Sequence, residues 1–501
     1  MSLIRAAAGQ DDSTAPHARL WRLNVVNSAV PVLIQGGMGM GVSSWSLARA
    51  VSQAGQLGVV SGVALDAMLA RRLQDGDRDG NMRRALKHFP AQAIAERVRK
   101  RYFRPTGRAA DEPYKPLPKL SLNPKREAQE LSILGNFVEV WLARDGHCGL
   151  VGVNYMEKLQ LATPFAAFGA MLAGVDYVLM GAGVPRQIPQ MLDAIAAGRQ
   201  GRISVDVHGA TEEYTVSVDP VDLLGTELPP LRRPSLLAIV SSNMLALYLA
   251  RDATIRPEGF VIEGPLAGGH NAPPRGKLRL DDDSQPIYGP KDDADLDKIA
   301  ALGLPFWLAG AYGRPERLVS ALAAGAAGIQ VGTLFALSRE SGITDKLRSQ
   351  LFAQLDGGGT PIVRTDALAS PTGFPFKVVT LADTLAEREV YEKRERLCDL
   401  SYLRQPFLQN NGEVGYRCAS EPVHMFVRKG GAAENTVGRV CLCNALTSTV
   451  GLGQTRKDGY TEPPLVTLGA DIEGVKALYD AHPDGWSAAD VIAWLGLEPR
   501  D

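Results

Sequence analysis

Phe260-Val261-Ile262-Glu263-Gly264-Pro265-Leu266-Ala267-Gly268-Gly269-His270 is the stretch from which the fold is best inferred. It is a short apolar run that passes directly into a glycine-rich loop ending in histidine. An apolar run of this length, bounded by turn residues, is typical of a strand buried on both faces of a parallel sheet. We therefore predict a strand that ends at Glu263 and a functional loop that follows it in the sequence.

The same pattern recurs along the chain between about residues 31 and 340, where short apolar runs alternate with longer helix-like segments. The runs expected to form strands are Pro31–Gln35, Leu57–Ser61, Leu150–Asn154, Val175–Met180, Leu236–Ser241, Phe260–Glu263, Leu304–Ala309 and Gly328–Val331. Parallel strands with helices between them define the α/β class. Eight such strands fit a TIM (β/α)8 barrel better than an open sheet.

The domain boundaries are inferred from the positions at which the alternation of strand-like and helix-like segments stops. We expect an N-terminal tail over residues 1–25, the barrel over 26–350 and a C-terminal extension over 351–501, packed on the barrel or covering its mouth. A long helical insertion is expected at about 65–149, after the second strand, with helices near Ala93–Tyr102 and Lys125–Ala143. A β-hairpin insertion is expected at about 200–220, because Ile203–Val207 and Tyr214–Val218 alternate with a two-residue period.

Composition narrows the function classes. With 45% hydrophobic residues, 22% charged residues and a net charge of −1, the 501-residue chain favours neither nucleic acid nor an anionic membrane as a partner. We find no run of about 20 apolar residues and no secretory signal. Five cysteines in so long a chain do not indicate a disulfide framework, so a cytoplasmic location is expected. The oligomeric state stays open, with a homo-oligomer as one alternative.

Three predicted loops, after the first, sixth and seventh strands, are unusually glycine-rich, and loops at the carboxyl ends of the strands form the active site in this fold. The first, Gln35–Gly39, exposes backbone against which a planar ring or a phosphate can lie, although a plain tight turn is equally compatible. Gly310–Gly313 follows the seventh strand, and Gly332 and Thr333 follow the eighth. This pair of loops often forms a phosphate site in TIM barrels.

His270 is the candidate catalytic residue. It lies just past a strand end beside Gly268 and Gly269, and a group with a pKa near neutrality can exchange a proton with substrate. Arg275 and Lys277 follow closely and could bind an anionic substrate or a phosphopantetheine arm, although a solvated basic loop explains them more simply. Glu263, as a lone acid near a strand end, is expected to satisfy the backbone or cap a helix.

Together these motifs resemble a known family. Ile34–Gly39, Glu263–Pro265 with Gly268-Gly269-His270, and Gly328–Thr333 look like the nitronate monooxygenase group, formerly called 2-nitropropane dioxygenase and related to FMN-dependent enoyl-ACP reductases. The resemblance covers about residues 30–341, without the insertions. It departs from the family in having Gly310-Ala311 where a Gly-Gly pair is usual. It also has Asn271-Ala272-Pro273-Pro274-Arg275-Gly276 after the histidine.

The resemblance implies FMN as the cofactor and His270 as the acid or base beside it. The residues implied as its binding site are Gln35, Gly36, Gly37, Met38, Asn154, Gly268, Gly269, Gly310, Ala311, Gly313, Gly332 and Thr333. Of these, Gly310–Gly313 and Gly332–Thr333 would hold the phosphate. The flavin ring would lie near Gly36–Met38, in contact with Asn154.

Two reactions fit this family, and both use His270. The first choice is a nitronate monooxygenase, which would oxidise an alkyl nitronate with O2 to a carbonyl compound and nitrite. The alternative is an enoyl-thioester reductase of fatty acid or polyketide synthesis, with NAD(P)H as reductant and an acyl carrier protein as a possible partner. A third hypothesis, from another class, is a phosphosugar-binding or non-catalytic barrel without flavin.

The C-terminal extension holds four of the five cysteines, at positions 398, 418, 441 and 443. Four thiols in one region can ligate zinc or an iron–sulfur cluster. Their spacing lacks a CxxC pair, however, and buried free cysteines are common. Cys441-Leu442-Cys443 reads as a short apolar strand, so we predict no metal site.

Overall fold

The computed structural model describes residues 30–227 and 229–498, and the predicted tail over residues 1–25 lies outside them. The main sheet has eight parallel strands in the order β1-β10-β9-β8-β7-β4-β3-β2. These strands are β1 (Leu33–Gln35), β2 (Gly58–Ser61), β3 (Val151–Met156), β4 (Tyr177–Gly181), β7 (Ser235–Val240), β8 (Gly259–Glu263), β9 (Phe306–Ala309) and β10 (Gly328–Val331). A parallel bridge between Ile34 and Leu57 joins the two ends of this order, so the sheet closes into the predicted TIM barrel.

The barrel interior is a packed apolar core, as the apolar strand runs require. Trp307 is its largest side chain; it is fully buried, and its indole N–H donates to the carbonyl of Pro31 at 2.8 Å. The remaining buried members come from alternate positions of several strands and are Ile34, Leu57, Val59, Leu179, Leu237, Val261 and Ala309. Each predicted strand run overlaps an observed strand.

Helices surround the barrel. They are α2 (Trp45–Gln53), α7 (Thr163–Leu172), α8 (Ile188–Ala196), α10 (Asn243–Arg251), α11 (Leu296–Ala300), α12 (Pro315–Ala323), α13 (Thr333–Ala336) and α14 (Asp345–Leu355). Ser44 caps α2 by accepting a hydrogen bond from the amide of Leu47, which satisfies one of the amides that a helix start leaves without a partner. None of the described helices combines the length and the apolar character that crossing a membrane requires.

The insertion after β2 contains α3 (Leu65–Gln74), α4 (Asn81–Leu86), α5 (Gln92–Tyr102) and α6 (Arg126–Arg144). The predicted helices near residues 93–102 and 125–143 are α5 and α6, whereas α3 and α4 were not expected. Helix α6 packs against α2, α3 and α7 and so takes the place of the crossover helix between β2 and β3. The approach of α7 is close, because a Cβ on Gly169 would lie 2.1 Å from the carbonyl oxygen of Ile133.

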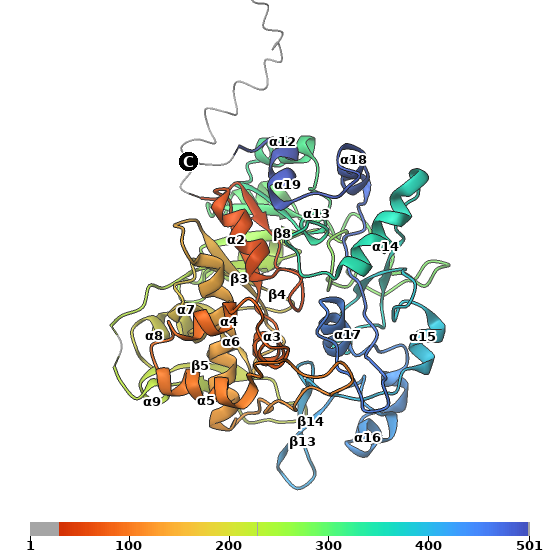
Figure 1. Cartoon of the computed structure of the whole chain (residues 1–501). Coiled ribbons are helices and arrows are strands. Elements are labelled where there is room, and N and C mark those ends of the chain that lie inside the picture. The colour runs from red at the N-terminus through yellow and green to blue at the C-terminus, as the bar shows by residue number, and fades with distance from the viewer. Residues whose placement is uncertain (1–29, 228, 499–501) are drawn as a thin grey trace, which may run out of the picture.

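The hairpin insertion is β5 (Gly201–Val205) paired antiparallel with β6 (Tyr214–Val218), followed by α9 (Pro220–Leu224). Beyond α14 lie two further antiparallel pairs and short helices, which run along one side of the barrel (Figure 1). These elements are η1 (Asp356–Gly358), β11 (Val363–Asp366), β12 (Phe376–Val379), α15 (Arg388–Lys393), β13 (Gln405–Leu408), β14 (Val414–Arg417), α16 (Val423–Arg428), η2 (Ala433–Thr436), α17 (Leu442–Thr449), α18 (Glu473–Ala481) and α19 (Ala488–Trp494).

This C-terminal region shares a hydrophobic core with the barrel. Trp486 is fully buried among barrel residues, and its indole N–H donates to the carbonyl of Leu334 at 2.8 Å. Val466 and Leu468 belong to the same core. The expected strand at Cys441–Cys443 is wrong: Cys441 is the N-cap of α17, and the apolar residues that follow form a helical face buried in the core.

Candidate functional site

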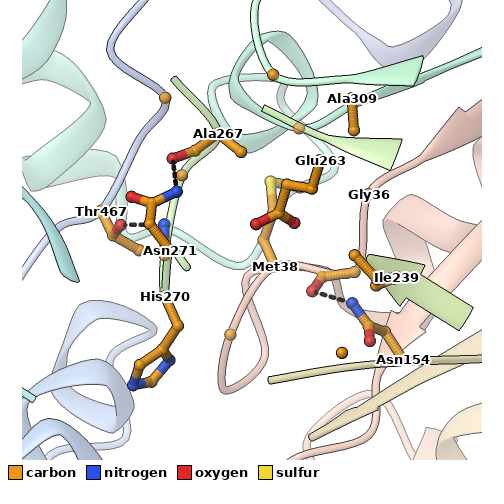
Figure 2. A pocket seen from close by; sticks show the side chains of 18 of the residues that line it. Gly36, Met38, Asn154, Ile239, Glu263, Ala267, His270, Asn271, Ala309 and Thr467 are labelled. Carbon is orange, nitrogen blue, oxygen red and sulfur yellow. Dashed lines mark hydrogen bonds between the residues drawn. The ribbon is translucent and has the colours of Figure 1, made fainter. Parts of the chain in front are cut away.

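A cavity of about 420 Å³ opens at the carboxyl ends of the barrel strands, within the size range of small-molecule sites. Figure 2 shows part of its lining. Nearly all the residues predicted for the site meet here. Those that line it are Gly36, Gly37, Met38, Asn154, Gly268, Gly269, His270, Gly310, Ala311, Gly313, Gly332 and Thr333.

Gln35 does not line the cavity, and its expected contact with a cofactor needs correction. Its side chain is fully buried beneath the first loop. The amide group donates to Ser43 Oγ at 2.8 Å and accepts a hydrogen bond from the backbone N–H of Val59 at 3.0 Å. Gln35 therefore links β1 to β2, where the sheet closes, and supports the Gly36–Gly39 loop through Ser43.

The first loop and the end of β3 approach each other closely. Asn154 Nδ2 donates to the carbonyl of Gly37 at 3.1 Å, a contact that Figure 2 shows. A Cβ on Gly37 would lie 2.3 Å from Asn154 Cβ, so the residue at this position must lack a side chain. Ser43 Oγ accepts from the amide of Met38 at 2.8 Å and fixes the other side of the loop.

The loops after β9 and β10 present backbone N–H groups to the cavity. Gly310 and Ala311 both have positive φ, at 87° and 68°, which turns the chain sharply after β9. No described residue accepts a hydrogen bond from the amides of Ala311, Tyr312, Gly313, Gly332 or Thr333. Unpartnered amides on two adjacent loops form a concavity suited to an anion.

His270 lies at the side of the cavity formed by the C-terminal extension (Figure 2). Its Nε2 shares a hydrogen bond of 2.7 Å with Ser370 Oγ, and its ring packs edge-on against Phe376 with centroids 4.9 Å apart. Burial lowers the pKa of His270 to about 4. The imidazole is therefore neutral at neutral pH and has a fixed orientation.

The loop that carries His270 is attached to β12. The amide of Lys377 donates to the carbonyl of Gly269 at 2.9 Å, and the amide of Asn271 donates to the carbonyl of Pro375 at 2.9 Å. The turn at Ser370–Pro375 thus supplies the partner of the histidine. The extension completes the site instead of only packing beside it.

Glu263 is the functional candidate that sequence reasoning set aside. Figure 2 shows its side chain reaching into the cavity from the end of β8. The carboxylate makes no hydrogen bond or ion pair with any described residue, so it neither caps a helix nor satisfies the backbone. Burial raises the pKa of Glu263 to about 8. Its strand-end position was visible in the sequence, but its lack of a partner was not.

The extension contributes a wall that the sequence did not predict in detail. Its lining residues are Phe374, Phe376, Tyr402, Leu403, Leu442, Cys443, Leu446, Thr467, Leu468, Gly469, Asp471, Gly474 and Val475. No arginine or lysine is among the described lining residues. Arg275 instead ties loops together, because its guanidinium donates to the carbonyl of Ser241 at 2.8 Å and also to that of Lys291. The cavity is therefore mainly apolar and carries no cationic side chain.

The cysteines remain free thiols, and Cys443 alone among them lines the cavity. Burial raises the pKa of Cys418, Cys441 and Cys443, which disfavours their thiolate forms. The described residues contain no group of three or more histidine, cysteine, aspartate or glutamate side chains placed to hold a metal ion.

Comparison with known proteins finds no matching family model. One curated relative is (3aS,4S,5R,7aS)-5-hydroxy-7a-methyl-1-oxo-octahydro-1H-indene-4-carboxyl-CoA dehydrogenase of Mycobacterium tuberculosis, which is 30% identical over 120 residues. The match spans 24% of this chain and 30% of the length of that relative.

Solved structures of similar arrangement include FabK from Thermotoga maritima, with a TM-score of 0.44, 15% identity and 94% of each chain covered. The nitroalkane oxidase from Streptomyces ansochromogenes has a TM-score of 0.44 and 15% identity over 93% of this chain and 95% of that one. The enoyl reductase domain of MlnA from Bacillus amyloliquefaciens has a TM-score of 0.43 and 11% identity, over 95% and 98%.

Proposed function

We propose that this chain is an FMN-dependent oxidoreductase whose active site is the cavity at the carboxyl ends of the barrel strands. The observation that carries this proposal is the pair of loops after β9 and β10, whose unpartnered amides line one part of an otherwise apolar cavity. A phosphate group attached to a planar, largely apolar ring matches those two surfaces. The motif resemblance points to the same cofactor.

The residues present fit FMN. The amides of Ala311–Gly313, Gly332 and Thr333 would hold its phosphate, without a lysine or arginine. Asp471 also lines this region, and its carboxylate lies 3.9 Å from Arg314 Nη2, which partly balances its charge. Gly36–Met38 and Asn154 would contact the ring. When bound, FMN would supply transfer of a hydride between a nicotinamide and a carbon atom of the substrate.

For the substrate we propose an enoyl thioester, which reverses the order that the sequence suggested. A nitronate is an anion, and no described lining residue offers it a cationic side chain, whereas a thioester group is neutral. The Mycobacterium tuberculosis relative is likewise named for a carboxyl-CoA substrate. Oxidation of an alkyl nitronate remains the second candidate, because the motifs resemble that family as closely.

His270 would assist either reaction from its neutral form. Ser370 and Phe376 fix the ring, and the low pKa keeps it uncharged. Because Ser370 engages Nε2, Nδ1 is the ring nitrogen left for the substrate. A fixed hydrogen-bond donor placed against a thioester carbonyl stabilises the charge that develops on its oxygen.

The test compares the two substrate classes on the FMN-loaded protein. Under anaerobic conditions, NAD(P)H oxidation that depends on an enoyl-CoA, with the saturated thioester as product, is expected. Nitrite release from an alkyl nitronate in air, without enoyl-dependent NAD(P)H oxidation, would replace the thioester proposal with the monooxygenase. A protein that binds no flavin and catalyses neither reaction would refute both and support the flavin-free barrel.

A further inference from the structure

Two ionisable side chains line the same cavity. Glu263 enters from the end of β8 in the barrel, and His270 lies on the side of the C-terminal extension, as Figure 2 shows. Burial moves their pKa values in opposite directions, to about 8 for the carboxyl group and to about 4 for the imidazole. At neutral pH the Glu263 carboxyl group is therefore protonated, and the His270 imidazole is in its neutral form. Pairs of groups shifted apart in this way mark the acid and the base of an active site.

The surroundings of Glu263 explain why it stays neutral. Burial is the sole cause of its raised pKa, so neither a cation nor an anion nearby sets it. Tyr288 is an ionisable neighbour of Glu263; burial raises the pKa of Tyr288 to about 12, and the charges of Asp292 and then Glu263 add to that shift. The Tyr288 hydroxyl donates to the carbonyl of Ala272 at 3.0 Å, away from the carboxylate. His270 and Asp471 are the other charged or basic groups on the cavity wall.

A buried carboxyl group without a partner is costly to keep unless it serves a purpose. No described residue forms a hydrogen bond or an ion pair with the Glu263 carboxyl group. A hydrophobic residue at this position would therefore serve the fold equally well. Its neighbours along β8 are Val261 and Ile262, which are buried core residues. The position of the carboxyl group is therefore explained by contact with a ligand in the cavity and not by a role in stabilising the fold.

We propose that Glu263 is the proton donor of the proposed thioester reduction, with His270 as a hydrogen-bond donor to the thioester oxygen. This inference rests on the proposed function. Hydride addition to the β-carbon leaves an enolate, with its electron pair shared between the α-carbon and the thioester oxygen. The O–H bond of Glu263 then breaks and a C–H bond forms at the α-carbon. Solvent returns a proton to the carboxylate, and NAD(P)H supplies the two electrons of each turnover.

The experiment uses the FMN-loaded protein and the variant Glu263→Gln, which keeps the shape of the side chain but has no acidic proton. Glu157→Gln is the matched control. Glu157 is a partly buried glutamate just past the end of β3, with a raised pKa, but it accepts a hydrogen bond from Gln160 and does not line the cavity.

Two measurements are made on each protein. The first is infrared absorption of protonated carboxyl groups as a function of pH, which does not depend on turnover. A band that disappears near pH 8 is expected in the wild type and in Glu157→Gln, and it is expected to be absent in Glu263→Gln. The second is enoyl-CoA reduction, which is expected to fall roughly 10²- to 10⁴-fold in Glu263→Gln with FMN still bound.

The outcomes separate this inference from the proposed function. Wild-type protein that binds FMN and reduces enoyl-CoA, while Glu263→Gln does so at the same rate and with the same pH profile, overturns the role of Glu263 alone. The same holds if the infrared band persists in Glu263→Gln. Wild-type protein without enoyl-CoA reduction instead overturns the proposed function, whatever the infrared band shows.

Discussion

Replacing Gly37 by alanine places a methyl group against the side chain of Asn154. The new Cβ would lie 2.3 Å from Asn154 Cβ, 2.9 Å from Nδ2 and 3.0 Å from Cγ. Rotation of the asparagine cannot relieve the contact, because its Cβ is fixed by the backbone of β3. Either the loop or the strand end must move, and the hydrogen bond from Asn154 Nδ2 to the carbonyl of Gly37 breaks.

The expected cost is the sum of these two effects. Overpacking at a rigid contact costs about 1–3 kcal/mol, and the lost hydrogen bond costs about 0.5–1.5 kcal/mol. The free energy of unfolding of Gly37→Ala should therefore fall by about 1.5–4.5 kcal/mol. Both partners are expected FMN contacts, so FMN affinity should fall about tenfold or more, the equivalent of about 1.4 kcal/mol.

Chemical denaturation of the apoprotein and FMN fluorescence titration measure the two quantities. Gly39→Ala is the control in the same loop, because its Cβ would meet only Leu446 Cδ1 at an ordinary 3.6 Å. Asn154→Ala should not rescue Gly37→Ala, since its Cβ remains, whereas Asn154→Gly should. If Gly37→Ala matches Gly39→Ala in stability and FMN affinity, the close approach of this loop to β3 is refuted.

Three further predictions concern the cavity. His270→Asn should retain FMN and lose about 10²- to 10³-fold in turnover; unchanged turnover with flavin bound would end its assignment. Because burial raises the pKa of Glu263 to about 8, the folded chain keeps a proton that the unfolded chain releases above about pH 4.3. The free energy of unfolding therefore decreases as pH rises from about 4.3 to about 8, and at pH 7 the decrease amounts to about 3 kcal/mol. Chemical denaturation at several pH values should show a smaller decrease in Glu263→Gln. Riboflavin, which lacks the phosphate, should bind about 100-fold or more weakly than FMN in fluorescence titrations, since it forgoes charge-assisted hydrogen bonds to the amides of Ala311–Gly313 and Gly332; equal affinities would exclude these loops as the phosphate site.

The barrel was predictable because its strands are short apolar runs bounded by turn residues, a pattern that is present in the local sequence. The ends of helix α2 also carry local signals, since Ser44 caps its start and Gly55, with positive φ, follows its end. Helix α3 was not predictable, because it buries Asp66, Arg71 and Gln74, which read as surface residues. Their burial depends on distant partners: Tyr402 donates to the carboxylate of Asp66, and Arg71 donates to the carbonyl of Leu452.

In the candidate site, too, the residues set by local sequence were predictable and those that depend on distant partners were not. The glycine loops and His270 follow strand ends, and a barrel must bring such positions together. The partnership of His270 with Ser370 joins residues 100 positions apart and required the pairing of its loop with β12. Glu263 was set aside because a lone acid usually finds a structural partner, and only the folded chain reveals that it has none.

Binding of FMN to the purified chain tests the central claim most directly. We expect saturable binding of one FMN per chain, a yellow protein after removal of free flavin, and clearly weaker FMN binding in Gly37→Ala. A chain that is correctly folded, stays colourless and binds no FMN would contradict the claim.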